Sequence, residues 1–222
     1  MIIVFDLDDT LYNEKYFVYS GFSEVAKWVS LMSNNSYNEI FDSMIKELTF
    51  NGRGKIFDIV LEKYFLKTKK NIQKCISIYR LHKPAINLDS EVIDLLLELR
   101  KNHKLYIVTD GNKIVQKNKI KSLDVEKYIE KAYITHRYSL SASKPSLKCF
   151  ELIRNKEKVD WQNMVYIGDN PYKDFVNLNK VNAFTIRIIQ GDFAHVEVSK
   201  GYDAKFKIKN LADLKKVIKK NL

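Results

Sequence analysis

The sequence predicts a doubly wound α/β fold with a mainly parallel sheet and an all-helical segment inserted after the first strand. Short apolar runs rich in β-branched residues recur along the chain and alternate with helical patterns. Several of these runs end in an acidic or hydroxyl residue. The alternation stops between residues 13 and 84, where only helical patterns are found. These three observations predict a layered core with a separate helical insert.

The first strand is expected at residues 2–5, because this run is apolar throughout, as in a strand buried on both faces of a parallel sheet. Four later runs of the same kind are expected to form strands: residues 105–108, 132–134, 164–167 and 183–186. Helical patterns lie between or beside them: residues 92–99, 114–120, 147–153 and 175–178. This alternation is typical of a sheet with helices on both faces.

The insert contains four helical patterns and three polar or glycine-containing breaks. The patterns cover residues 17–32, 37–50, 56–65 and 72–81, and the breaks fall at 33–36, 51–54 and 68–71. Pro84 marks the return to alternating strands and helices, because a proline disfavours helix at the residue before it. We therefore expect a core domain of residues 1–12 plus 85–222 and a helical domain of residues 13–84.

The composition indicates a globular protein with an excess of basic residues. Hydrophobic residues make up 45% of the 222 residues, and the formal charge is +11 from 38 basic and 27 acidic side chains. Basic proteins can bind nucleic acid or phosphorylated small molecules. The lysines are spread along the chain, however, and between residues 205 and 220 the spacing of Leu211, Leu214 and Ile218 predicts a last helix with a solvated lysine face. A nucleic-acid partner is therefore not expected.

Two further features bear on where the protein works. Cys75 and Cys149 lie 74 residues apart without a CxxC pattern, which favours buried, reduced thiols in a cytoplasmic protein over a disulfide or zinc site. No apolar run approaches the ~20 residues of a membrane span. A membrane partner is not expected, and a monomer or a homodimer is.

The first candidate for chemistry is the pair Asp6 and Asp8 directly after the first strand. Residues two apart in extended chain point to the same side, so the two carboxylates would favour a cation between them, and Mg²⁺ prefers such ligands. Asp6 could then attack a phosphorus atom, and Asp8 could give a proton to the leaving oxygen. The pair alone could equally be an ordinary turn or helix cap.

Two candidates for phosphate binding follow later strands. Thr109, Asp110 and Gly111 end the second strand, where a hydroxyl group and backbone N–H groups could bind phosphate oxygens. The alternative is a plain turn in which Asn112 caps the next helix. Lys144 precedes a proline and a helix, and its ammonium could neutralise phosphoryl oxygens, although any single lysine in so lysine-rich a chain can be a surface residue.

The third group is the acidic loop after the strand at residues 164–167. Asp169 is placed to hold Mg²⁺, and Asp174, five residues later, could hold Lys144 or a metal-bound water. The alternative is simple charge complementation at a helix N-terminus. Because the carboxyl ends of parallel strands meet at one edge of a sheet, we expect Asp6, Thr109 and Asp169 to lie near one another.

In this order and on these elements, the motifs resemble those of the haloacid dehalogenase superfamily, whose core is Rossmann-like. The resemblance covers nearly the whole chain. It implies Mg²⁺ as cofactor, Asp6 as nucleophile and Asp8 as acid/base, with the main-chain carbonyl of Asp8 as a further metal ligand. By the same resemblance Thr109 and Lys144 bind phosphate and Lys144 assists catalysis, Asp169 and Asp174 complete the metal site, and Asp110 has only a backbone role.

The resemblance also implies a reaction class. The dehalogenases of this superfamily lack an acid at the position of Asp8, so Asp8 favours hydrolysis of a phosphate monoester. A phosphomutase, or a non-catalytic anion-binding protein on the same fold, remain alternatives. The helical insert corresponds to the family's cap, which implies a small phosphorylated metabolite as substrate, such as a sugar phosphate or a nucleoside monophosphate.

Substrate specificity is expected to come from the insert and the end of the first strand. The loop at residues 51–55 joins two expected helices, and its glycines would let it approach a ligand closely. Candidate specificity residues lie in this loop, just before the return to the core, and beyond the first strand: Arg53, Lys55, Arg80, His82 and Tyr12. Surface charge at helix ends is the alternative for the basic ones.

Overall fold

The computed structural model describes residues 1–221 and divides the chain into two compact units. The core unit consists of Met1–Glu14 and Asn87–Leu222, and the helical unit consists of Lys15–Ile86. Both divisions fall two residues later than the expected boundaries (14 against 12, and 86 against 84). The helical unit is thus an insertion directly after the first strand and its exit turn.

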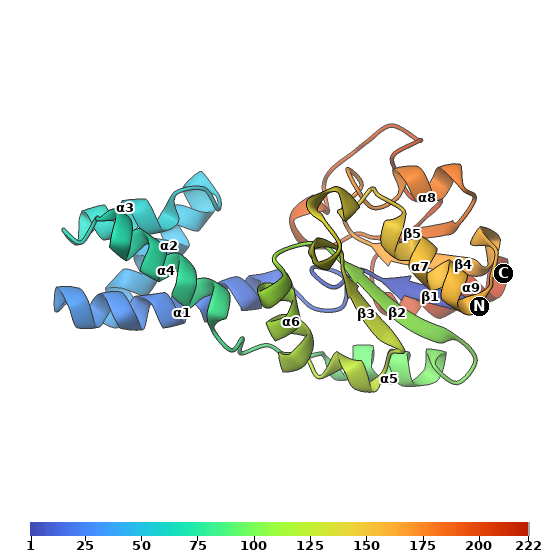
Figure 1. Cartoon of the computed structure of the whole chain (residues 1–222), viewed down its shortest axis with the longest axis horizontal. Coiled ribbons are helices and arrows are strands. Elements are labelled where there is room, and N and C mark those ends of the chain that lie inside the picture. The colour runs from blue at the N-terminus through green and yellow to red at the C-terminus, as the bar shows by residue number, and fades with distance from the viewer. Residues whose placement is uncertain (222) are drawn as a thin grey trace. The chain divides into compact units, whose positions relative to one another are not determined.

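The core unit contains one parallel sheet, as expected (Figure 1). Over the described residues its strand order is β3-β2-β1-β4-β5-β6, and every neighbouring pair is parallel. The strands are β1 Ile2–Phe5, β2 Lys104–Thr109, β3 Lys131–Ile134, β4 Met164–Gly168, β5 Phe184–Ile188 and β6 Phe206–Ile208. The predicted doubly wound α/β class and its five strands are therefore confirmed.

The sequence interpretation missed β6. Residues 205–220 were expected to form one last helix, whereas the structure has a short edge strand followed by a helix. Phe206–Ile208 spans three residues with an exposed lysine in the middle, which is too short for the alternation of apolar residues to stand out. Leu211, Leu214 and Ile218 are buried while Lys215 and Lys219 are exposed, so the solvated lysine face is confirmed.

Helices cover both faces of the sheet (Figure 1). They are α5 Ser90–Leu99, α6 Lys113–Ser122, α7 Lys148–Glu157, α8 Val176–Lys180 and α9 Leu214–Asn221. Short 3-10 helices lie at Val125–Lys127, Thr135–Arg137, Leu140–Ala142, Trp161–Asn163, Gly191–Phe193 and Leu211–Asp213. In Figure 1, α5 and α6 lie on one face of the sheet and α7 and α8 on the other.

Alternation along β1 explains why its sequence is apolar throughout. Ile2 and Val4 belong to the cluster that packs against Phe150 of α7, and the two residues that alternate with them, Ile3 and Phe5, are equally buried. A strand in the middle of a sheet with helices on both faces has no solvent-facing side. The central position of β1 therefore follows from its composition.

The strand register brings the carboxyl ends of three strands level. Phe5, the last residue of β1, pairs with Ile107 of β2 on one side and with Ile167 of β4 on the other. The residues that follow these strands therefore emerge at the same edge of the sheet. In open α/β sheets this edge is where ligands bind.

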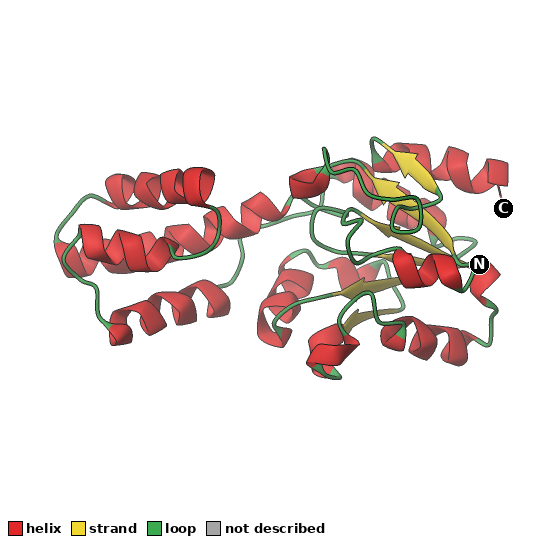
Figure 2. Ribbon diagram, turned by 90° about the horizontal axis from the view of Figure 1, so that it is seen from above, coloured by secondary structure: helices red, strands yellow, loops and turns green. Residues whose placement is uncertain are grey.

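The helical unit contains four helices and, over its described residues, no strand (Figure 2). They are α1 Glu14–Ser33, α2 Tyr37–Asn51, α3 Ile56–Lys63 and α4 Lys69–Leu81. The buried residues of α1 follow helical spacing, from Phe17 through Phe22 to Val29. Gly21 gives α4 room, because a Cβ there would lie 2.5 Å from the ring of Tyr79. The unit is therefore a small bundle with its own core.

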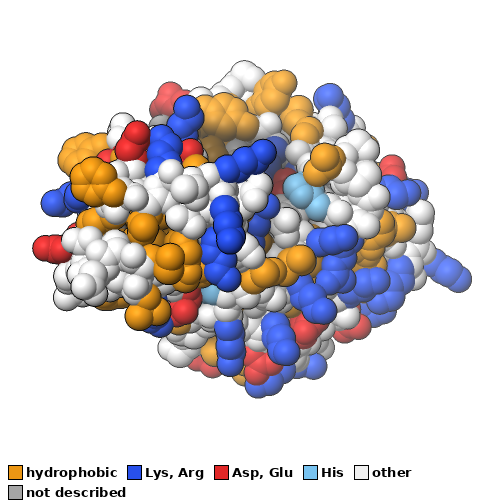
Figure 3. Space-filling model, turned by 60° about the vertical axis from the view of Figure 1, so that its left-hand side comes forward, with side chains coloured by type: hydrophobic (Ala, Val, Ile, Leu, Met, Phe, Trp, Pro, Cys, Tyr) orange, Lys and Arg blue, Asp and Glu red, His pale blue; other side chains and the backbone are white. Residues whose placement is uncertain are grey.

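The remaining sequence expectations concern cysteines, surface charge and membranes. Cys75 and Cys149 are both free and buried, as expected, and burial raises the pKa of Cys75 to about 12 and that of Cys149 to about 11. Lys and Arg side chains on the face seen in Figure 3 are interspersed with hydrophobic and acidic ones. Among residues 1–221, no helix combines the length and the hydropathy that crossing a membrane requires.

Candidate active site

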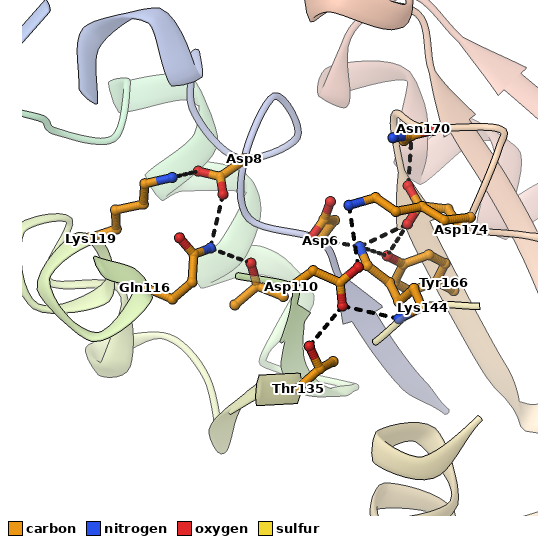
Figure 4. Close-up of polar contacts among 12 residues, drawn as sticks. Asp6, Asp8, Asp110, Gln116, Lys119, Thr135, Lys144, Tyr166, Asn170 and Asp174 are labelled. Atoms are coloured by element: carbon orange, nitrogen blue, oxygen red, sulfur yellow. Dashed lines mark hydrogen bonds and ion pairs between the residues drawn. The ribbon is translucent and has the colours of Figure 1, made fainter. Parts of the chain in front are cut away.

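Asp6 lies at the centre of a buried cluster of charges. It follows β1 directly, and 4% of its surface is exposed. The Nζ of Lys144 lies 2.9 Å from Oδ1 of Asp6 and 2.8 Å from Oδ1 of Asp174 (Figure 4). Lys144 comes from the loop between β3 and α7, so three distant parts of the sequence meet here. One buried ammonium thus joins two buried carboxylates.

Backbone and side-chain donors fix the second carboxylate of this cluster. The hydroxyl of Tyr166 donates to Oδ1 of Asp174 at 3.0 Å, and the Asn170 N–H donates to Oδ2 at 2.9 Å. Lys144 Nζ in turn donates to the Tyr166 hydroxyl at 2.9 Å. Gly168 is required beside Asp174, because a Cβ there would lie 2.5 Å from Oδ2 of Asp174. The glycine at the end of β4 thus makes room for the acid that holds Lys144.

Asp110 fixes the backbone of the Lys144 loop. Its Oδ1 accepts hydrogen bonds from the Thr135 hydroxyl at 2.8 Å and from the Lys144 N–H at 3.1 Å. The Nζ of Lys173 lies 3.3 Å from Oδ2 of Asp110. The expectation that Asp110 acts only through its backbone is therefore wrong. Its side chain ties the end of β2 to the lysine of the site.

Three acids of the cluster could hold a metal ion together. Asp6, Asp169 and Asp174 each offer a carboxylate oxygen, and these atoms lie within 4.8 Å of one another. Burial, opposed by Lys144, raises the pKa of Asp6 from 3.8 to about 6. Burial, together with Asp6 and Asp174, raises the pKa of Asp169 to about 9. Together, Asp6, Asp169 and Asp174 would carry more negative charge than Lys144 balances. A bound cation would offset this excess of negative charge.

The neighbouring carboxylates also explain why Lys144 is positively charged. Burial alone would lower the pKa of Lys144, but the carboxylates of Asp174 and Asp6 hold it well above its ordinary value. The ammonium therefore stays charged at neutral pH. A permanent positive charge beside Asp6 can balance either a carboxylate or the oxygens of a phosphoryl group.

The carboxylate of Asp8 lies apart from this cluster (Figure 4). Oδ1 accepts hydrogen bonds from the Tyr12 hydroxyl at 2.6 Å and from Lys119 Nζ at 2.7 Å, and Oδ2 accepts one from Gln116 Nε2 at 2.9 Å. Although burial opposes it, Lys119 and the other donors hold the pKa of Asp8 below its usual value. We expected Asp6 and Asp8 to flank one cation with their side chains, and the acidic cluster instead comprises Asp6, Asp169 and Asp174.

The chain bends at Leu7, between the two acids, which explains this difference. The extended path that would point alternate residues to one side therefore ends before Asp8, and Asp9 follows in a turn with a φ of 48°. Asp9 Oδ1 accepts a hydrogen bond from the Glu14 N–H at 2.8 Å and so caps the start of α1. Gln190 Nε2 donates to the carbonyl of Asp9 at 2.8 Å. Asp9 thus acts in the exit turn.

The residues at the end of β2 show features of both sequence interpretations, a phosphate-binding site and a plain turn with a helix cap. The Thr109 hydroxyl is buried and accepts a hydrogen bond from Gln116 Nε2 at 2.6 Å. Gly111 has a φ of 129°, a conformation that favours glycine. The Asn112 side chain accepts hydrogen bonds from the N–H groups of residues 114 and 115, so it does cap α6. Thr109 nevertheless lies at the sheet edge that carries Asp6.

The structure places the specificity candidates in two groups. Tyr12 belongs to the core unit, and its hydroxyl donates to Asp8. In the helical unit, a cavity of about 350 Å³ has Arg53 and Arg80 in its wall, beside the aromatic rings of Phe22 and Tyr79. Two residues far apart in the sequence thus share one cavity.

The other two candidates of the helical unit lie differently. Lys55 is exposed and directly precedes α3. His82 is buried, with its ring 5.0 Å from that of Phe17 and its Nδ1 2.7 Å from the carbonyl oxygen of Tyr79. These contacts make His82 part of the packing of the helical unit.

Sequence reasoning missed three residues that contact the candidate site. Tyr166 lies within the apolar run of β4, where its hydroxyl gives no signal, and Gln116 and Lys119 lie on α6 among other polar residues. A buried lysine cannot be told from a solvated one by composition. The sequence offered one signal, the positions of these residues along the helix. Gln116 and Lys119 are three residues apart and so lie on one face of α6, next to the buried Ile120.

Comparison with known proteins identifies the family. Residues 3–188 match the family described as haloacid dehalogenase-like hydrolase. The chain belongs to this family. It is 29% identical over 226 residues to a glyceraldehyde 3-phosphate phosphatase of Methanocaldococcus jannaschii, covering 98% of this chain and 96% of the relative. It is 26% identical to the Pyrococcus furiosus protein of the same name, covering 99% and 93%.

Solved structures of other haloacid dehalogenase-like hydrolases share this fold. A 2-haloacid dehalogenase from Pseudomonas syringae aligns with a TM-score of 0.67 at 18% identity, covering 99% of this chain and 98% of that one. A HAD phosphatase from Thermococcus onnurineus aligns with a TM-score of 0.61 at 22% identity, covering 98% and 97%. The expected superfamily and the expected enzyme class, a phosphoric monoester hydrolase, are therefore confirmed.

Proposed function

We propose that this enzyme is a Mg²⁺-dependent phosphatase that hydrolyses a small sugar phosphate through an aspartyl-phosphate on Asp6. The observation that carries the proposal is the buried cluster at the end of β1. There Asp6 pairs with Lys144 at 2.9 Å and shares a potential metal site with Asp169 and Asp174. A nucleophile, a permanent cation and a metal-binding set of acids are the parts that phosphoryl transfer requires.

The donor set fits Mg²⁺. The three carboxylates supply oxygen ligands only, which Mg²⁺ prefers, and Mg²⁺ also binds phosphate oxygens and keeps several waters. The raised pKa of Asp169, caused by burial and then by Asp6 and Asp174, marks negative charge that a cation would offset. Asp6, Asp169 and Asp174, with the main-chain carbonyl of Asp8, would hold the ion. When bound, Mg²⁺ would neutralise charge on the transferring phosphoryl group.

The residues of the chain then have separate roles. In the first step the Asp6 carboxylate forms a bond to phosphorus as the bond from phosphorus to the ester oxygen breaks, and Asp8, which must be in its protonated form for this step, gives that oxygen its proton. In the second step Asp8 takes a proton from a water that attacks the phosphorus, which releases phosphate and restores Asp6. Lys144 balances charge throughout, and the Thr109 hydroxyl and backbone N–H groups of residues 110 and 111 orient the phosphoryl oxygens.

The names of the relatives narrow the choice of substrate. The sequence left sugar phosphates and nucleoside monophosphates open, whereas two relatives that match almost the whole chain are named glyceraldehyde 3-phosphate phosphatase. We therefore propose a three-carbon sugar phosphate as substrate.

The test is a phosphate-release assay of the purified full chain on glyceraldehyde 3-phosphate, other sugar phosphates and nucleoside monophosphates. We expect glyceraldehyde 3-phosphate to have the highest kcat/KM, and we expect EDTA to abolish the activity and Mg²⁺ to restore it. Preference for a nucleoside monophosphate would refute the substrate. Formation of an isomerised sugar phosphate without free phosphate would identify a phosphomutase instead.

Replacing Asp169 tests the metal site without an activity assay. Because the pKa of Asp169 is raised from 3.8 to about 9, by burial and by Asp6 and Asp174, the metal-free protein loses stability as the pH rises through this range. Each pKa unit corresponds to roughly 1.4 kcal/mol. We therefore expect metal-free Asp169→Asn to melt at a higher temperature than metal-free wild type at about pH 8, and Mg²⁺ to stabilise wild type more as the pH rises.

Thermal melting in EDTA and in Mg²⁺ measures both effects. The control is Asp160→Asn, which changes an exposed acid of the same unit. Its melting temperature should follow that of wild type in both buffers. Equal stabilisation of wild type and Asp169→Asn by Mg²⁺ would exclude Asp169 as a ligand.

A further inference from the structure

Lys119 is a buried lysine outside the cluster around Asp6. Its side chain is 2% exposed, and its Nζ lies 2.7 Å from Oδ1 of Asp8 and 2.9 Å from Oε1 of Glu14. Both acids are partly buried, at 21% and 17% exposure. Taking an ammonium out of water costs several kcal/mol, and apolar residues of similar size are often as stable as such a pair. Stability alone therefore does not account for a lysine at this position.

The contacts of α6 fix the direction of the Asp8 carboxylate. Lys119 and the Tyr12 hydroxyl both donate to Oδ1, and Gln116, one turn before Lys119 on α6, donates to Oδ2. Both oxygens are thus held by donors from two parts of the core unit, which leaves the carboxylate little rotational freedom. Figure 4 shows Lys119 and Gln116 reaching Asp8 from the same helix.

The same helix face joins Asp8 to the end of β2. The Nε2 of Gln116 also donates to the hydroxyl of Thr109 at 2.6 Å. One face of α6 therefore sets the positions of two side chains that have roles in the proposed mechanism. Asp8 transfers protons, and Thr109 binds the phosphoryl group. A proton-transfer group must be placed to within a fraction of an ångström of its target.

We propose that Lys119 is a positioning residue that aims the Asp8 carboxyl at the leaving-group oxygen, with Gln116 and Tyr12 completing the arrangement. The inference rests on the proposed function, because it requires Asp8 to move protons. Lys119 does not itself touch the substrate. Its loss allows Asp8 to rotate, so proton delivery to the leaving oxygen becomes slower while attack by Asp6 does not.

Leaving-group dependence distinguishes this role from a structural one. Nitrophenolate departs readily without a proton, whereas phenolate depends more on proton delivery, and the two aryl phosphates are otherwise similar in shape. The ratio kcat/KM covers the steps up to departure of the leaving group. For Lys119→Met we expect kcat/KM to fall about 100-fold on phenyl phosphate and less than about fivefold on 4-nitrophenyl phosphate.

Two further variants make the measurement decisive. Tyr12→Phe removes one hydrogen bond to the same Asp8 oxygen with little change of shape, and it should show the same selective loss at smaller size if Lys119→Met does not fold. Lys117→Met changes an exposed lysine of the same helix and should match wild type on both substrates. All are measured on the full chain with saturating Mg²⁺.

The outcomes separate this inference from the function on which it rests. An equal loss on both substrates, or no loss on either, in Lys119→Met and Tyr12→Phe would overturn the positioning role and leave the phosphatase standing. A wild-type chain inactive on both aryl phosphates and on glyceraldehyde 3-phosphate would overturn the proposed function, and the role of Lys119 with it. Selective loss on phenyl phosphate supports both.

Discussion

Asp6→Asn is expected to lower kcat by at least about 10⁴-fold, because an amide cannot form the phosphoenzyme. The substitution keeps the size of a side chain that is 4% exposed, and it removes one of the buried acids that share Lys144. We therefore expect the fold and the melting temperature to be retained. The measurement is phosphate release from glyceraldehyde 3-phosphate, with circular dichroism to verify the fold.

The matched control for Asp6→Asn is Asp94→Asn, which makes the same chemical change at an exposed site on α5 of the core unit. This variant should keep wild-type kcat. If Asp6→Asn kept substantial activity on every phosphate tested, Asp6 would not be the nucleophile, and the proposed function would fail at its first step.

Lys144→Met is expected to have the second large effect, on stability as well as activity. It leaves Asp6 and Asp174 buried without the ammonium that lies within 2.9 Å of both. Breaking a buried pair in this way costs about 3–5 kcal/mol of unfolding free energy. Loss of a preorganised charge at the phosphoryl group should lower kcat by about 10²–10³-fold. Urea unfolding and phosphate release measure the two effects.

A double variant tests the physical reason for the instability. Lys144→Met with Asp174→Asn removes one of the uncompensated carboxylates, so we expect it to recover part of the stability lost in Lys144→Met alone, without recovering activity. Lys148→Met, an exposed lysine nearby, is the control and should behave as wild type. Additive destabilisation in the double variant would show that the buried charges are not coupled.

The positions of the site at the strand ends could be predicted from the sequence. An apolar run directly before Asp6, and another before Gly168 and Asp169, mark strands buried on both faces. The parallel register then brings these ends together, as the pairing of Phe5 with Ile107 and Ile167 shows. The fold class and the meeting of Asp6 with Asp169 follow from this regular geometry.

What could not be predicted depends on the direction of individual side chains. The sequence around Asp8 does not predict that its carboxylate contacts Lys119, because that contact joins residues 111 positions apart. The role of the Asp110 side chain likewise depends on where the Lys144 loop returns. The strand β6 was not predicted for a different reason. Its three residues are too few to show the alternation of apolar and polar residues that indicates a strand.

The most direct test of the central claim is to trap the covalent intermediate. Rapid acid quench of the full chain during turnover of labelled glyceraldehyde 3-phosphate, followed by peptide mass spectrometry, locates any bound phosphoryl group. We predict a single hydroxylamine-sensitive phosphoryl group on Asp6, formed only with Mg²⁺ and absent from Asp6→Asn. Phosphate release with no labelled enzyme at any quench time, or a label on another residue, would contradict the assignment of Asp6 as the nucleophile.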